Sequence, residues 1–414
     1  MQQRWSPLRT RGIPVPVSRE QVESETLETF QEELPSVYYS DKPDEVFFSY
    51  LRNAEFMYRR HFSFPPQMFS GASLIDFGAG TGENTVYLAR WGATCTLVEM
   101  NPWALEIARS VFDRFAPGGA SSHRFIESSI FGFEEDSLYD IVHCRGVLSH
   151  TAAKEEAFQR IARHVRPGGY LIFGDPNKAG GFQNMLQRYA VYAFADTKQQ
   201  MMEVSEALFK EDIDRSQAAI PRTRKSIIFD RWVIQQQDDP SVSEVMEWFR
   251  SAGLEFYSAY PPFLPPLVGD SVHHPEKYDW ASVDDVGVFA EVVWMLQAEG
   301  DGENEAALDS AYRELAGRFA ALTSAIQNFS ARSAMTPESF VESSGSLRSA
   351  TSELDLYAPI KRRLVGLLEE SERFVHAVDS GDLPAVQRVM AEAQHLFRGA
   401  TGVRHVDFIG YRPE

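Results

Sequence analysis

Cysteine, basic charge and long apolar runs are all scarce in this 414-residue chain. Its two cysteines, Cys95 and Cys144, are too few for a disulfide-stabilised secreted scaffold. No apolar stretch reaches about 18 residues, so we predict no membrane-spanning helix. The polar first residues also lack the apolar core of a secretory signal. We therefore expect a cytoplasmic protein that does not bind membranes.

Acidic residues outnumber basic ones, because 59 Asp and Glu accompany only 40 Lys and Arg and give a formal net charge of −19. A surface of this sign repels phosphate backbones at long range, whereas nucleic-acid-binding proteins usually carry basic patches. The composition thus argues against RNA or DNA as a partner. An acidic surface that only aids solubility is the plain alternative.

One glycine-rich segment, residues 75–84, carries the strongest functional signal and reads IDFGAGTGEN. It follows an apolar run and precedes a helical pattern, which predicts a strand, a turn and a helix. Glycine allows a sharp turn and close approach of a ligand, and the next helix directs its first N–H groups at that ligand. Glu99 closes the following apolar run, 21 residues past Gly78. An acid at that distance suits the hydroxyls of a ribose.

Two nucleotide-type ligands compete for this geometry. The dinucleotide fingerprint G-x-G-x-x-G/A requires a small residue where this chain has Glu83, and a carboxylate there would face the pyrophosphate. The observed D-x-G-x-G-x-G, from Asp76 to Gly82, instead resembles motif I of the class I S-adenosylmethionine-dependent methyltransferases. The resemblance extends from about residue 38 to about residue 260. Further segments similar to the family's strands and turns are 98–102, 104–109, 139–142, 146–150 and 166–172.

The resemblance implies an α/β fold with a doubly wound, mostly parallel seven-stranded sheet in the order 3-2-1-4-5-7-6. Strands and helices alternate from residue 73 to residue 175, as such a sheet requires. In that order Cys95 and Cys144 lie two strand spacings apart, about 9–10 Å, which is too far for a disulfide. We interpret them as buried core thiols. The predicted strands are 73–77, 94–99, 123–127, 139–144, 170–174 and 254–260.

We divide the chain into four parts. Residues 1–35 are expected to be a loosely ordered N-terminal arm, and 36–260 the methyltransferase core. Residues 261–400 read as an added helical module. Residues 401–414 alternate like a strand and are expected to return to the core sheet; a lone strand packed on the helices is the competing interpretation.

Within the core, residues 178–235 interrupt the alternation as an insertion on the substrate side. We predict helices near 182–194 and 197–210, and a strand-like run at 227–229. Apolar positions with helical spacing also predict a helix over 43–61, placed to cap the cofactor pocket.

The resemblance implies S-adenosyl-L-methionine as the cofactor and indicates where it binds. Glu99 is expected to accept both ribose hydroxyls, while Asp76 either orients the turn or reaches the ammonium group. Serines stand after the third strand where the family commonly has an aspartate near the adenine. Arg145 is placed near the methionine end, or else pairs with an acid. The predicted cofactor-binding residues are Asp76, Gly78, Ala79, Gly80, Gly82, Asn84, Glu99, Met100, Ser128, Ser129, Ile130 and Arg145.

Methyl transfer is a direct displacement, so the protein mainly holds the acceptor in line with the methyl group. A hydroxyl acceptor also benefits from a base. His150 follows the fourth strand and has an ordinary pKa near neutrality, so it is the first candidate, and Asp175 is the second. Asp175 and Asn177 offer too few oxygen ligands to predict a metal site. The predicted substrate-binding residues are Tyr38, Tyr39, Arg222 and Arg224.

These features predict a methyltransferase that acts on a small polar metabolite, most of all on an oxygen of a sugar-like or other hydroxyl or carboxyl acceptor. N-methylation of a small molecule is the alternative within the enzyme class. A non-catalytic cofactor-binding scaffold, with the helical module as its protein-interaction surface, is the alternative outside it. The same module is a candidate surface for a homodimer.

Overall fold

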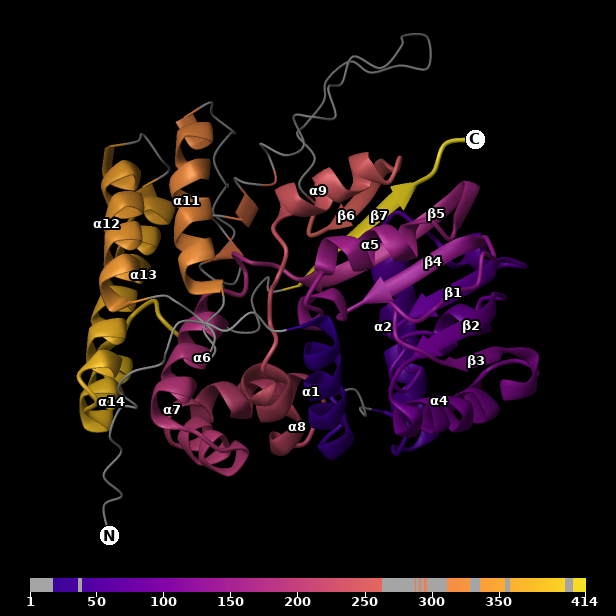
Figure 1. Cartoon of the computed structure of the whole chain (residues 1–414), viewed down its shortest axis with the longest axis horizontal. Coiled ribbons are helices and arrows are strands. Elements are labelled where there is room, and N and C mark those ends of the chain that lie inside the picture. The colour runs from indigo at the N-terminus through magenta and orange to yellow at the C-terminus, as the bar shows by residue number, and fades with distance from the viewer. Residues whose placement is uncertain are drawn as a thin grey trace.

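The computed structural model describes residues 18–35, 39–262, 287, 290–291, 294–295, 311–327, 336–353, 358–398 and 405–414. Its centre is a seven-stranded sheet in the order β3-β2-β1-β4-β5-β7-β6 (Figure 1). β7 pairs antiparallel with both β5 and β6, while the pairs from β3 to β5 are parallel. The predicted fold class is confirmed. The strands are β1 (Ser73–Phe77), β2 (Thr94–Glu99), β3 (Arg124–Glu127), β4 (Tyr139–Arg145), β5 (Val165–Pro176), β6 (Glu255–Tyr260) and β7 (His405–Tyr411).

Helices cover both faces of the sheet because its central strands carry apolar side chains at successive positions. In β1, Ile75 and Phe77 pack in the core with α5 and α9, whereas Leu74 packs on the opposite face with α2, α3 and α4. Both cysteines are buried and free, and burial raises the pKa of each thiol. The covering helices are α2 (Asp44–Arg60), α3 (Val86–Arg90), α4 (Pro102–Phe115), α5 (Lys154–Ala162) and α9 (Val242–Ser251); short turns are η1 (Pro66–Phe69), η2 (Ala120–Ser122) and η3 (Leu148–His150).

The expectation of a loosely ordered arm is wrong for residues 19–32, which form helix α1 (Arg19–Glu32). The Ser18 side chain caps this helix by accepting from the Gln21 N–H. Its buried side chains, Val22, Thr26 and Thr29, include only one that is apolar, so hydrophobic periodicity gave no signal. Its stability comes from tertiary contacts instead. Figure 1 shows α1 between the sheet and the helices of the insertion. Residues 1–17 lie outside the described residues.

The insertion after β5 is helical throughout. The predicted strand-like run at 227–229 is wrong, because these residues end α8 and begin the π-helix η4. A short buried apolar run fits a strand or a helix equally well, so periodicity could not separate them. The insertion contains α6 (Phe182–Phe194), α7 (Lys198–Ala219), α8 (Arg224–Ile228) and η4 (Phe229–Val233).

The C-terminal helices pack against the insertion rather than forming a separate body. One apolar core joins α6 and α7 to the later helices through residues such as Phe182, Leu322 and Leu367 (Figure 1). A homodimer through these helices and the exact part boundaries stay predictions. These helices are α11 (Ala311–Gln327), α12 (Pro337–Glu353), α13 (Ala358–Asp379) and α14 (Leu383–Glu392).

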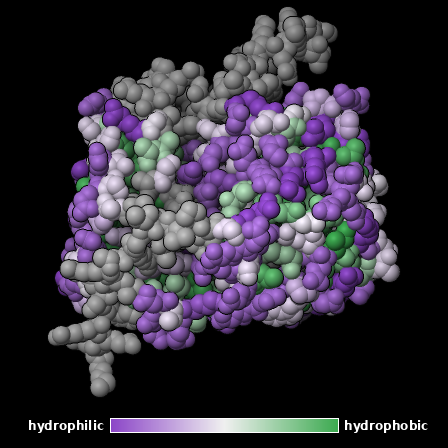
Figure 2. All heavy atoms as spheres, in the orientation of Figure 1, coloured by the Kyte–Doolittle hydropathy of each residue, from purple (hydrophilic) through white to green (hydrophobic). Residues whose placement is uncertain are grey.

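The face of the molecule seen in Figure 2 is mainly polar. Figure 2 shows hydrophilic residues over most of the visible face, with apolar residues only in small patches. Within the described ranges, every helix is too short or too polar to span a bilayer.

Candidate active site

The glycine turn joins β1 to α3 at the carboxyl end of the sheet. Gly78, Gly80 and Gly82 have φ of 71°, 53° and 71°, a left-handed conformation that glycine adopts without strain. Space also requires glycine at Gly78, because an added Cβ would lie 2.4 Å from a methyl carbon of Val147. The Gly78 N–H donates to the Val98 carbonyl over 2.8 Å. The turn is therefore fixed between the ends of β1, β2 and β4.

Glu99 ends β2 beside this turn and is only 9% exposed. Its Oε2 accepts from the Gly80 N–H and its Oε1 from the Asn101 N–H, both over 2.8 Å. Burial raises the pKa of this carboxyl, although the backbone hydrogen bonds oppose the shift. A carboxylate has about four lone-pair sites on its two oxygens, so Glu99 keeps acceptor capacity for a ligand hydroxyl. The glycine turn and the predicted ribose acid are thus one hydrogen-bonded unit.

Asp76 lies beneath the turn and is 2% exposed. Its Oδ1 is 2.7 Å from His143 Nδ1 on β4, and its Oδ2 accepts from the Thr85 hydroxyl at the start of α3. Both carboxylate oxygens therefore bond to groups at the junction of β1, β4 and α3. This geometry favours orientation of the turn, and contact with the cofactor's ammonium stays a prediction.

Hydrogen bonds connect Tyr39 and Ser40, which precede α2, to the same turn. Glu83 Oε1 accepts from the N–H groups of Tyr39 and Ser40 over 3.0 and 2.7 Å. The Tyr50 hydroxyl donates to Asn84 Oδ1 over 2.6 Å, and its ring stacks on that of Tyr39 with centroids 4.3 Å apart. The Glu83 side chain thus connects the residues before α2 to the glycine turn, a role that its sequence position did not reveal. Tyr38 lies outside the described residues.

Ser128, Ser129 and Ile130 follow β3 and form a tight turn next to Glu99. The Ser128 N–H donates to the Glu99 carbonyl over 3.1 Å, and Ser129 Oγ accepts from the Gly132 N–H over 3.1 Å. Ile130 is 8% exposed and packs in the sheet core. The segment lies beside the ribose acid, where the adenine is predicted, but its contact with adenine stays a prediction. Met100 and Ala79, the remaining predicted contacts, adjoin Glu99 and the turn.

Arg145 ends β4 and is paired with an acid from the far end of the chain. Its Nε and Nη2 donate to Asp407 Oδ1 and Oδ2 over 2.6 and 2.9 Å. This guanidinium holds the pKa of the buried Asp407 well below its ordinary value. Of the two roles considered for Arg145, the structure therefore shows the ion pair; the acid is buried in β7 rather than on the surface.

His150 follows β4 and is oriented by backbone of the segment that follows the insertion. Its Nδ1 lies 3.0 Å from the Gln236 carbonyl oxygen. A carbonyl only accepts, so Nδ1 carries the proton and Nε2 keeps its lone pair. Burial lowers the pKa of the imidazole. The Phe30 ring of α1 contacts the imidazole edge-on, with the ring centroids 5.5 Å apart. His150 is thus neutral at neutral pH and able to accept a proton at Nε2.

Burial raises the pKa of Asp175, near the end of β5, whereas it lowers that of His150. Asp175 is 2% exposed, and its Oδ2 accepts from the Ser149 N–H over 2.9 Å. Burial, with the nearby Asp239 carboxylate, raises its pKa to about 8. A carboxyl that holds its proton at neutral pH cannot act as a base. This arrangement favours His150 over Asp175, and a base role for either residue stays a prediction.

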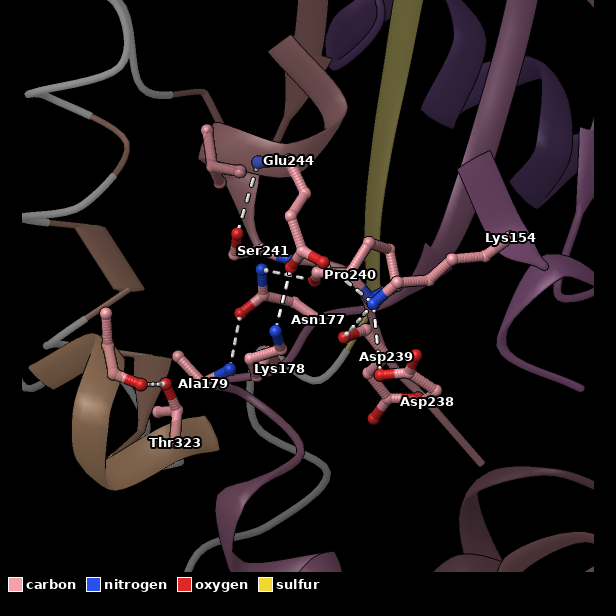
Figure 3. Close-up of polar contacts among 12 residues, drawn as sticks. Lys154, Asn177, Lys178, Ala179, Asp238, Asp239, Pro240, Ser241, Glu244 and Thr323 are labelled. Carbon is pink, nitrogen blue, oxygen red and sulfur yellow. Dashed lines mark hydrogen bonds and ion pairs between the residues drawn. The ribbon is translucent and has the colours of Figure 1, made fainter. Parts of the chain in front are cut away.

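A partly buried ionic network joins the segment after β5 to α5 and α9 (Figure 3). Lys154 Nζ lies 3.0 Å from Asp238 and 2.9 Å from Glu244, which also accepts from Lys178 over 2.8 Å. Asn177 Oδ1 accepts from two backbone N–H groups, those of residues 179 and 180. Across the residues that the structure describes, no group of three or more His, Cys, Asp or Glu is placed to hold a metal ion.

Arg222 and Arg224, predicted to bind substrate, are held by acids of the insertion. Arg222 Nη2 lies 2.8 Å from Asp230. Arg224 pairs with Glu206 over 2.5 Å and also with Asp214. The Arg224 pairs join α8 to α7, and the Arg222 pair joins the loop before α8 to η4, so a structural role accounts for both arginines. Their acidic partners come from 8 to 18 residues away, and only the packing of the helices brings them together.

Comparison with known proteins finds similarity to methyltransferases over part of the chain. A family model described as a methyltransferase domain matches residues 50–208. The ubiquinone biosynthesis O-methyltransferase of Schizosaccharomyces pombe mitochondria is 30% identical over 104 residues, covering 25% of this chain and 38% of that protein. The ubiquinone biosynthesis O-methyltransferase of Shewanella pealeana is also 30% identical, over 114 residues that cover 26% and 45% of the two chains. The chain thus spans less than half the length of these curated relatives.

Among solved structures, magnesium protoporphyrin IX methyltransferase from Synechocystis, with bound S-adenosylhomocysteine, aligns with a TM-score of 0.31 and 12% identity. That alignment covers 59% of this chain and 81% of the other. The sequence matches confirm the family resemblance for the segment that contains the glycine turn, Glu99 and His150.

Proposed function

We propose that this chain, whose residues 50–208 match the model of a methyltransferase domain, binds S-adenosylmethionine at the glycine turn and methylates an oxygen atom of a small molecule. The observation that carries the proposal is the pairing of Glu99 with the turn, through the Gly80 N–H bond of 2.8 Å. This hydrogen bond holds a carboxylate that can still accept hydrogen bonds. It holds it next to glycine backbone, where no Cβ blocks the approach of a ligand. An adenosine needs both features, one for the ribose and one for close approach.

When bound, the cofactor supplies an electrophilic methyl group on a sulfonium whose sulfur leaves as a neutral thioether. The chain's own residues then have two tasks. Glu99 and the glycine turn fix the position of the adenosyl end. His150 removes the proton from the acceptor hydroxyl at Nε2, since its Nδ1 is committed to the Gln236 carbonyl. The preference for oxygen over a neutral amine rests on this arrangement, because a hydroxyl gains more from a base.

The test is cofactor binding followed by transfer. Titration calorimetry of the full chain with S-adenosylhomocysteine should give one site per chain, whereas NADH should not bind. Methyl transfer from labelled S-adenosylmethionine to small hydroxyl compounds should be saturable in both substrates. Absence of S-adenosylhomocysteine binding would refute the proposal. Binding without transfer to any small molecule would instead favour a scaffold.

A further inference from the structure

Several buried polar atoms beyond β4 and β5 have no hydrogen-bond partner. They are Asp175 Oδ1, Ser149 Oγ, and both Oδ1 and Nδ2 of Asn184 on α6. The three residues are 2%, 0% and 4% exposed, respectively. Unpaired polar atoms are costly to bury, and most such atoms in folded proteins have partners. A group of them next to a reaction site therefore points to a ligand that supplies the missing hydrogen bonds.

Residues 231–239, here named the strap, run antiparallel along α6. At one end, Arg188 donates to the carbonyls of Arg231 and Gln235, each over 3.0 Å. At the other end, Asp239 Oδ2 lies 2.6 Å from where a Cβ on Gly181 would stand. Gly181, Asn184 and Arg188 follow each other at spacings of three and four residues, so they share one face of α6. Asn184 therefore faces the middle of the strap.

The other edge of the strap contacts the segment after β4. The Gln236 carbonyl accepts from His150 Nδ1 over 3.0 Å. The Asp238 N–H donates to the Ser149 carbonyl over 2.8 Å. Ser149 in turn binds Asp175 through its own N–H. Asp239 thus lies next to Gly181 and close enough to Asp175 to raise its pKa, which places Asn184, three residues along the same face of α6, toward Asp175 and Ser149.

We propose that Asp175, Ser149 and Asn184 form an acceptor subsite for a neutral polyhydroxylated molecule, such as a glycoside, in which a neighbouring hydroxyl is held while another is methylated. This inference rests on the proposed methyltransferase function. The Asn184 amide offers a donor and an acceptor, and the Ser149 hydroxyl offers both. Two adjacent hydroxyl groups match this set. Asp238 is paired with Lys154, but Asp239 also lies close by on the strap, and its charge disfavours an anionic acceptor.

The protonation state of Asp175 agrees with this assignment. Burial and the adjacent Asp239 keep its pKa near 8, so at neutral pH it is a neutral donor rather than an anion. Its Oδ2 is already taken by Ser149, which leaves Oδ1 for the ligand. An Asp175→Asn variant retains a neutral donor and should bind the acceptor within about threefold of the wild type, whereas Asp175→Ala should not.

The experiment measures binding of methyl glycosides to the full chain saturated with S-adenosylhomocysteine. The probes are the methyl α-glycosides of glucose, galactose, mannose and rhamnose, each with its deoxy analogues, followed by saturation-transfer NMR. At least one glycoside should bind, and the analogue that lacks the hydroxyl next to the reacting one should bind at least about tenfold more weakly. Asn184→Leu should cause a similar loss.

Thermal stability separates this role from a structural one. Asn184→Leu removes no protein hydrogen bond, so its unfolding midpoint should stay or rise. The matched control is Gln187→Leu on the same helix, because Gln187 Nε2 donates to Asp212 over 3.1 Å. That control should unfold at a lower temperature and bind the glycoside normally.

Each other outcome counts against one claim. If S-adenosylhomocysteine binds but none of the glycosides does, the subsite is refuted and the proposed function stands. If Asn184→Leu lowers the unfolding midpoint and leaves glycoside binding intact, Asn184 is structural and the subsite is likewise refuted. Failure of S-adenosylhomocysteine itself to bind refutes the proposed function.

Discussion

Arg145 and Asp407 are 262 residues apart in the chain and form a two-bond ion pair, with Nε–Oδ1 and Nη2–Oδ2 distances of 2.6 and 2.9 Å. The pair joins the end of β4 to β7 across Gly174 of β5, where an added Cβ would clash with the Asp407 carboxylate. It couples the C-terminal strand to the half of the sheet that holds the glycine turn and Glu99.

Asp407→Asn should destabilise the protein by about 3–5 kcal/mol, because it leaves a buried guanidinium without its counter-charge. Chemical denaturation followed by fluorescence measures the change. Asp382→Asn is the control, since Asp382 is half-exposed and its pair with Arg388 is 3.4 Å long. That surface change should stay within about 0.5 kcal/mol. Equal effects of the two substitutions would contradict the structural importance of the Arg145 pair.

Glu99→Ala should weaken S-adenosylhomocysteine binding by about 1.5–3 kcal/mol, the range for hydrogen bonds to a charged group. Titration calorimetry measures it directly. Glu106→Ala, at an exposed glutamate of α4, should leave the affinity unchanged. Because the pKa of Glu99 is raised by burial, affinity should also fall on acidification before ordinary surface carboxyls titrate. An unaltered affinity in Glu99→Ala would remove the ribose assignment.

His150→Gln should lower kcat by about 10²–10⁴-fold on the true acceptor, the usual contribution of a positioned base. Cofactor affinity should not change. His164→Gln is a matched control, because His164 Nδ1 also bonds a backbone carbonyl over 3.0 Å and its pKa is lowered by burial as well.

The pH profile gives an independent check on the base. The pKa of His150 lies below its ordinary value, so the imidazole loses its proton at a lower pH than usual. The wild-type kcat should therefore rise with pH in the acidic range and level off before neutrality. A pH-independent kcat, with full activity in His150→Gln, would exclude this histidine as the base.

Asp175→Asn should stabilise the protein more at pH 8 than at pH 5. The folded carboxyl has its pKa raised to about 8, whereas an unfolded one titrates near about 3.9. Between these values the folded state binds more protons, so the Asp175 contribution to stability falls as pH rises, by up to about 1.4 kcal/mol per pH unit. The amide cannot ionise and escapes this loss. Thermal unfolding of both proteins at several pH values measures it; a constant difference between them would show that Asp175 is ionised throughout.

Local sequence patterns were enough to predict the bounds of several strands and helices and the position of the glycine turn. The bounds of β1 and β2 and of α6 agree with those read from the sequence, because periodicity and glycine position act over a few residues. The same holds for the glycine turn and the acid at Glu99, since their spacing along two adjacent strands fixes their distance in the sheet.

Tertiary structure alone decided the partners of the charged and polar residues. Arg145 meets Asp407, and His150 meets Gln236, only because strand order and the insertion bring distant segments together. α1 was missed for the same reason, as its stability comes from contacts with remote residues such as the bond from Asn101 Nδ2 to the Phe30 carbonyl. The sequence by itself determined the core strands and the glycine turn, which depend on short-range patterns, while the order of the strands followed from the family resemblance. The pairing and protonation of the site residues depend on long-range packing and burial, and so only the folded chain decided them.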